Sequence, residues 1–155
     1  MIPRVQYKDL KEKIASNKLL LVNGPRAVGK QTIINEILSA TGLPFLELNG
    51  KDKPTKKEFE SVDSNSLNSI FGGHRFIVIH EAQYLEKLQT IIEEVLSSDW
   101  NITLILACSY EPVMDEVLRE VLQLQGLEVQ LMPPTFYELA QHNGLTNEEK
   151  LLEQR

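Results

Sequence analysis

Seven residues near the N-terminus constrain this chain more than any other stretch, since they set two glycines and a lysine at a fixed spacing: Gly24-Pro25-Arg26-Ala27-Val28-Gly29-Lys30. The apolar run at residues 19–22 precedes them and predicts a buried strand. An amphipathic pattern follows, with four apolar residues on one helical face: Ile33, Ile34, Ile37 and Leu38. The segment therefore predicts a strand, a glycine loop and a helix.

The spacing GxxxxGK between a strand and a helix is the Walker A pattern, and its chemistry is phosphate binding. Gly24 and Gly29 permit backbone angles and close approach that side chains forbid, so successive N–H groups can surround phosphate oxygens. The helix starting near Lys30 adds its positive end, and the ammonium contributes about 1.5–3 kcal/mol through a charge-assisted hydrogen bond. The alternative is a tight turn with a solvent-facing lysine.

The residue after Lys30 departs from the pattern, because Gln31 stands where Ser or Thr would place a hydroxyl on Mg²⁺. Thr32 comes one residue later. A one-residue step rotates a side chain by about 100° around a helix, so Thr32 should not reach the same point. Either Gln31 coordinates magnesium through its amide oxygen or a water, or the metal is held poorly.

Short apolar runs alternate with helical spacing along the rest of the chain, which predicts an α/β fold. Further strands are expected at residues 45–48, 76–79, 102–107 and 127–131, and the first helix should end near Thr41-Gly42. Weak helical segments occupy residues 56–71. Two more helices are indicated by apolar spacing: one carries Leu85, Leu88, Ile92, Val95 and Leu96, and the next has Pro112 in its first turn and carries Val113, Val117, Leu118, Val121 and Leu122.

Polar residues interrupt two of the five expected strands: Glu47 in the second, and Glu128 and Gln130 in the fifth. The other three are nearly continuous in apolar residues, as central parallel strands are. We therefore expect a five-stranded parallel sheet with the second and fifth strands outermost. The order of the remaining strands does not follow from this pattern.

Composition limits the class of protein. The 155 residues are 42% hydrophobic and suit one compact domain, with no apolar run long enough for a membrane helix. A net charge of −6 disfavours nucleic-acid binding. The local basic stretch at residues 51–57 is interrupted by Asp52 and followed by Glu58, so it predicts a solvated loop more than a nucleic-acid patch. The N-terminus shows no secretory signal, and the single cysteine, Cys108, suits a reducing compartment. These features together predict a cytoplasmic protein.

A second motif, Arg75-Phe76-Ile77-Val78-Ile79-His80-Glu81, has the form of a Walker B strand, which delivers acidic groups to a nucleotide. The usual aspartate, which holds magnesium through water, is His80 here. The following Glu81 remains to polarise the attacking water. The alternative for Glu81 is a solvated residue at a strand end.

With these motifs the chain resembles the AAA-like prokaryotic ATPases, which have a GPR-x-VGKTT phosphate loop, a hydrophobic strand ending in DE-x-Q and a later PLSF-like element. The corresponding segments are Gly24-Pro25-Arg26-Ala27-Val28-Gly29-Lys30-Gln31-Thr32, His80-Glu81-Ala82-Gln83 and Pro133-Pro134-Thr135-Phe136-Tyr137-Glu138. The resemblance spans about residues 4–141.

This resemblance implies a three-layer P-loop NTPase sandwich of the additional-strand class, with sheet order 5-1-4-3-2 and helices on both faces. It implies ATP or ADP as ligand, Lys30 and Glu81 as catalytic residues, and Ser109 as the residue that senses the γ-phosphate. Leu124-Gln125 stands where many relatives show Gly-Arg. Family members commonly carry a C-terminal domain, so the expectation is one ATPase domain over residues 1–155 without it.

The departures Gln31, His80 and Gln125 all concern magnesium or transition-state charge, whereas the glycines and Lys30 remain. We therefore expect nucleotide binding with weak hydrolysis in the isolated domain, magnesium being held at most through water by Gln31 and His80. Nucleotide state would then be coupled to a protein partner or a missing domain. The alternative is a degenerate, non-hydrolysing nucleotide-binding or interaction module. No NKxD-like guanine-reading element is present, which favours ATP.

Overall fold

The structure is a computed structural model that describes residues 4–25 and 29–131. Its strands are β1 Leu19–Asn23, β2 Phe45–Asn49, β3 Phe76–His80, β4 Thr103–Cys108 and β5 Glu128–Gln130. Its helices are α1 Arg4–Ser16, α2 Lys30–Ala40, α3 Lys53–Glu58, α4 Ser64–Phe71, α5 Leu88–Ser97 and α6 Glu116–Leu124, with a short 3-10 helix, η2, at Ala82–Tyr84.

The five strands form one parallel sheet in the order β2-β3-β4-β1-β5, which confirms the predicted order and both edge strands. Every residue of β1, β3 and β4 is buried, whereas β2 is only partly covered. Continuous apolar runs occupy the centre because helices cover both of their faces. All five carboxyl ends meet at one edge of the sheet, which is where ligands bind in open α/β folds.

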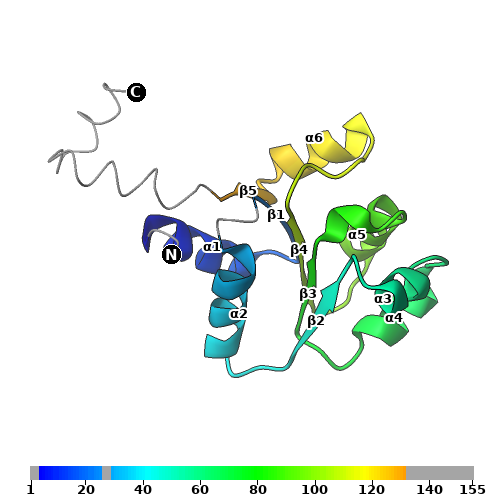
Figure 1. Ribbon diagram of the computed structural model, residues 1–155, viewed down its shortest axis with the longest axis horizontal. Coiled ribbons are helices and arrows are strands. Elements are labelled where there is room, and N and C mark those ends of the chain that lie inside the picture. The colour runs from blue at the N-terminus through cyan, green and yellow to red at the C-terminus, as the bar shows by residue number, and fades with distance from the viewer. Residues whose placement is uncertain (1–3, 26–28, 132–155) are drawn as a thin grey trace, which may run out of the picture.

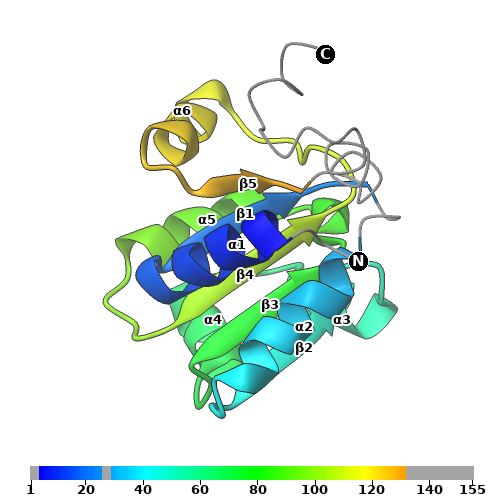
Figure 2. The same ribbon diagram turned by 90° about the vertical axis from the view of Figure 1, so that its left-hand side faces the viewer.

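Helices cover the sheet on both sides (Figure 1). Turning the molecule shows α1 and α2 together in front of one face (Figure 2). Successive strand residues alternate between two cores: Leu20 and Val22 pack with α1 and α2, while Leu19 and Leu21 pack with α4, α5 and α6. The three-layer α/β sandwich expected from the sequence is thereby confirmed.

Helix α1 is an element that the sequence analysis does not predict. Its apolar residues Leu10 and Ile14 lie one turn apart and are fully or almost fully buried against the α2 side of the sheet. Between them the helix is strongly charged, so its periodicity is weak by itself. The helix is stabilised by the sheet surface that it covers, and that surface exists only in the folded chain.

The start of α6 differs from the prediction, because the helix begins at Glu116 and not around Pro112. The side chain of Asp115 accepts a hydrogen bond from the Leu118 N–H at 2.8 Å and so caps the helix. Gln89 holds this cap in place through two further hydrogen bonds with Asp115, of 2.6 and 2.9 Å. Val113 therefore lies outside the helix, with 94% of its surface exposed.

Three smaller predictions also change. Leu85 lies outside α5, which begins at Leu88. It directly follows the 3-10 helix η2 and is the C-cap of that helix. The weak helical segments resolve into α3 and α4, and the lysines at positions 51, 53, 56 and 57 are solvent-exposed as expected. Strand β5 has only three residues.

Among the residues that the structure describes, no helix has the length and apolar character needed to cross a membrane.

Candidate nucleotide site

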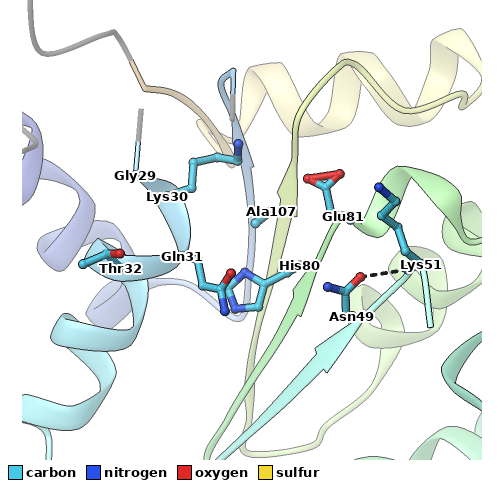
Figure 3. A pocket seen from close by; sticks show the side chains of 9 residues that line it. All are labelled: Gly29, Lys30, Gln31, Thr32, Asn49, Lys51, His80, Glu81 and Ala107. Carbon is cyan, nitrogen blue, oxygen red and sulfur yellow. Dashed lines mark hydrogen bonds between the residues drawn. The ribbon is translucent and has the colours of Figure 1, made fainter. Parts of the chain in front are cut away.

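A cavity of about 440 Å³ opens at the carboxyl edge of the sheet, between the start of α2 and the ends of β2 and β3 (Figure 3). Its lining comes from four separate stretches of chain: Gly29, Lys30, Gln31, Thr32, Asn49, Lys51, His80, Glu81 and Ala107. The Walker A and Walker B motifs thus meet in one cavity. Arg26, Ala27 and Val28 of the predicted loop lie outside the described residues, as do the segments at 133–138 and 147–155.

Lys30 occupies the inner side of the phosphate loop. Its side chain is buried, with 7% of the residue exposed, and Nζ donates to the carbonyl oxygens of Gly24 at 2.6 Å and Pro25 at 3.3 Å. Gly29 caps α2 with a left-handed φ of 80°, which explains the glycine at this position. The Gly24 N–H donates to the Cys108 carbonyl at 3.2 Å and ties the loop to β4. The interpretation of Lys30 as a solvent-facing lysine is therefore wrong.

Gln31 and Thr32 both line the cavity and are exposed. Figure 3 shows their side chains leaving α2 in different directions, as the 100° step between neighbours requires. Gln31 lies in the first turn of α2, where backbone N–H groups are not used inside the helix. The residue that directly follows Lys30 in this cavity is thus an amide and not a hydroxyl.

His80 ends β3 on the α2 side of the sheet and is 5% exposed. Its Nε2–H donates to Oε2 of Glu47 on β2 at 2.9 Å. Glu47 lies two residues before Asn49, which pairs with His80 in the parallel register. The sequence marks Glu47 only as a polar residue in an edge strand, so this partner becomes visible once the register of β2 and β3 is known.

Glu81 adopts φ 53° and is the only non-glycine residue with positive φ in the described part of the chain. Such a conformation is uncommon and costs on the order of 1 kcal/mol. Its carboxylate accepts hydrogen bonds from the Ser109 hydroxyl and from Gln83 Nε2, the latter at 2.9 Å. A hydrogen bond thus links Glu81, the predicted water-polarising residue, to Ser109, the predicted sensor. Gln83 is a further hydrogen-bond partner of Glu81. The interpretation of Glu81 as a plain solvated residue does not hold.

Two further cavity residues, Asn49 and Lys51, come from the end of β2 and the turn after it, and the sequence analysis does not identify them. The Asn49 side chain accepts from the Lys51 N–H at 2.9 Å, which shapes this turn. The Lys51 Nζ lies 5.3 Å from the centroid of the Tyr84 ring. No motif signals these residues, because parallel pairing of β2 with β3 alone brings them to the site.

With the fold and site described, comparison with known proteins gives the family. Residues 16–140 match the AAA domain family over more than half of the chain. This chain belongs to the AAA domain family. It is an AAA-type P-loop ATPase domain with the nucleotide-binding fold of that family. No curated protein matches its sequence.

Solved structures that resemble this AAA domain share its fold at low identity. The Holliday junction branch migration motor RuvB of Thermotoga maritima has a TM-score of 0.57 and 18% identity, covering 84% of this chain and 45% of its own. Domain III of the Thermotoga maritima replication initiation protein DnaA has a TM-score of 0.58 and 14% identity, covering 83% and 60%.

A structure of katanin, solved in a study of its self-assembly, has a TM-score of 0.58 and 17% identity, covering 84% of this AAA domain and 51% of its own chain. The AAA domain thus spans about half the length of the solved relatives that it matches. At such identities the likeness shows the shared fold and nothing further.

AAA relatives generally use ATP or ADP with Mg²⁺, but the described side chains that line this cavity fit the metal poorly. Mg²⁺ requires oxygen ligands in near-octahedral geometry. Among the described residues, Glu81 is the only carboxylate that lines the cavity, and it accepts hydrogen bonds from Ser109 and Gln83. Residues 4–25 and 29–131 contain no group of three or more His, Cys, Asp or Glu side chains placed to hold a metal ion. Magnesium binding by Gln31 and His80 stays a prediction from the sequence.

Proposed function

We propose that this AAA domain binds ATP or ADP in the cavity at the start of α2, and that Lys30 is the principal phosphate-binding side chain. The observation that carries the proposal is the position of this lysine, which is buried at the start of α2 and lines the same cavity as Glu81. Its hydrogen bonds go to the loop carbonyls of Gly24 and Pro25, and phosphate oxygens are stronger acceptors for a cation than amide carbonyls.

The roles of the other side chains follow from their positions. The loop N–H groups and the positive end of α2 would hold the phosphate tail. Glu81 would polarise the attacking water, and Ser109 would meet the terminal phosphate. Because the Ser109 hydroxyl donates to Glu81, a phosphate that takes over this hydroxyl would free one carboxylate oxygen for water. The nucleotide would in this way control its own hydrolysis.

Hydrolysis is proposed to be slow in the isolated domain. Phosphoryl transfer depends on neutralising the charge that spreads over the phosphate oxygens. Gln31 and His80 replace the groups that would hold a metal for this purpose, and Gln125 replaces an expected arginine. We propose that residues 1–155 act as one cytoplasmic ATPase unit whose nucleotide state is passed to a protein partner or to a further domain.

Thermal unfolding with ATP, ADP and GTP tests nucleotide binding. At a ligand concentration of 100 Kd, binding stabilises the folded state by about 2.7 kcal/mol. For a domain of this size that corresponds to a rise in Tm of roughly 5–11 °C. Adenine nucleotides should produce this rise and Lys30→Ala should abolish it.

The matched control is Lys11→Ala, which removes an exposed lysine on α1 and should leave the rise intact. An unchanged ATP response in Lys30→Ala would show that the nucleotide does not bind at this cavity. A response to GTP equal to that to ATP would contradict the choice of base.

A second candidate function is a nucleotide-binding module without hydrolysis, in which the ligand is a structural element. The bond between His80 and Glu47 favours it, because it occupies the position that should deliver a carboxylate to the metal. Phosphate release separates the two candidates. Release that disappears in Glu81→Gln would exclude the second candidate, and nucleotide stabilisation without release would exclude the first.

A further inference from the structure

We infer that this site binds the phosphate tail of its nucleotide without a divalent cation, through direct contacts from Lys30, Lys51 and Gln31. The inference rests on the proposed function, since it requires that a nucleotide binds in this cavity. It concerns how the negative charge of the phosphates is balanced.

His80 stands at the acidic metal position of the Walker B strand, and its side chain is already engaged. His80 is buried, and its Nε2–H is bonded to Glu47 at 2.9 Å. An imidazole presents nitrogen where Mg²⁺ requires oxygen. Turning His80 toward a metal would break its hydrogen bond to Glu47.

The side chain of Gln31, directly after Lys30, is a primary amide. A hydroxyl at this position can serve as a metal ligand, whereas a primary amide also carries two N–H donors. Those donors can bond a phosphate oxygen directly. They would add to the backbone N–H groups and the positive end of α2, where Gln31 lies. With Gln31 in place of the usual Ser or Thr, this position therefore offers donors for phosphate where a hydroxyl would serve the metal.

Positive charge around the cavity comes from two lysine side chains. Lys30 and Lys51 both line it, and Figure 3 shows them on opposite sides of Glu81. Their two ammonium groups carry the same charge as one divalent cation. The backbone bond from the Lys51 N–H to Asn49 and the position of Nζ beside Tyr84 keep the second lysine at the cavity edge.

The decisive experiment measures the Kd for ATP by titration calorimetry, on the full chain, in EDTA and in excess Mg²⁺. The two values should agree within about threefold, which is less than 1 kcal/mol. A Kd that weakens about tenfold or more in EDTA would overturn the inference while leaving the proposed function standing. Absence of ATP binding in both buffers would overturn the proposed function itself.

A pair of variants tests the role of Lys51. Lys51→Met removes the charge but keeps the aliphatic chain beside Tyr84, and it should weaken ATP binding in EDTA by about tenfold. Lys53→Met is the matched control, since Lys53 is exposed at the start of α3 and does not line the cavity. Equal affinities for Lys51→Met and the wild type in EDTA would contradict the assignment of Lys51.

Discussion

Gly50 directly follows β2 and lies against the backbone of the Walker B segment, so substituting it tests the geometry of the site. Its N–H donates to the His80 carbonyl at 2.7 Å. A Cβ at this position would lie 2.3 Å from the carbonyl oxygen of Glu81 and 3.4 Å from the Cα of Ala82. These are backbone atoms, so no side-chain rotation can relieve the clash.

The size of the effect follows from these distances. A carbon and a carbonyl oxygen normally stay about 3.3 Å or more apart, so Gly50→Ala requires the two segments to separate by about 1 Å. Overpacking of this kind costs about 1–3 kcal/mol. For a chain of this length we therefore expect Tm to fall by roughly 2–12 °C. Because the displaced atoms belong to Glu81, phosphate release should fall as well, by up to about 100-fold.

The assay is thermal unfolding with and without ATP, together with phosphate release. Gly42→Ala is the control, because Gly42 has φ 71° and a Cβ added there would have no atom within 4 Å. It should cost about 1–2 kcal/mol through backbone strain alone and leave both ATP binding and release unchanged. A wild-type Tm and wild-type release in Gly50→Ala would refute the close approach of β2 to Glu81.

Three further predictions test other parts of the molecule. Burial raises the pKa of the Cys108 thiol to about 12, so only about one thiol in 10⁴ is ionised at pH 8, and a thiol reagent should label it in denaturant but not in the native protein. The backbone N–H of Leu118 and the amide of Gln89 lower the pKa of Asp115 below its ordinary value of 3.8. The stability that this carboxylate adds is present above that ordinary value and is lost as pH falls through the lower, folded-state value. Asp115→Asn should therefore flatten the fall of Tm below about pH 5, and an unchanged acid profile would count against the cap. The triple variant Gln31→Thr, His80→Asp and Glu47→Gln supplies oxygen donors for Mg²⁺. EDTA should therefore weaken ATP binding to this variant about tenfold. Insensitivity to EDTA would show that other groups decide the metal requirement.

Local patterns in the sequence were enough to identify the fold class and the two edge strands, whereas the order of the strands came from the resemblance to the AAA-like ATPases. Continuous apolar runs marked the three central strands, and single polar residues such as Glu47 marked an edge. The glycines and Lys30 predicted the phosphate loop because their spacing is set by the backbone geometry of one strand, one turn and one helix. Glu81 could be identified for the same reason, as the residue that directly follows a buried strand.

Local patterns also missed helix α1 and misplaced the start of α6. Helix α1 has too few apolar residues to stand out among its charged ones, and Leu10 and Ile14 are buried only because the sheet supplies a surface. The start of α6 depends on Asp115, whose partner Gln89 lies 26 residues earlier in the chain. The cap from Asp115 to Leu118 is local, but the contact with Gln89 that holds it cannot be read from the residues next to the helix.

What the sequence by itself determined was therefore the fold class, the edge strands and the two motifs, since each depends on residues that are neighbours along the chain. The tertiary structure decided which charged and polar side chains contact one another in the site. His80 meets Glu47 across 33 residues, and Ser109 meets Glu81 across 28. These contacts exist because parallel strands bring their carboxyl ends to one edge in a fixed register, and a register is a property of paired strands, which no single segment contains.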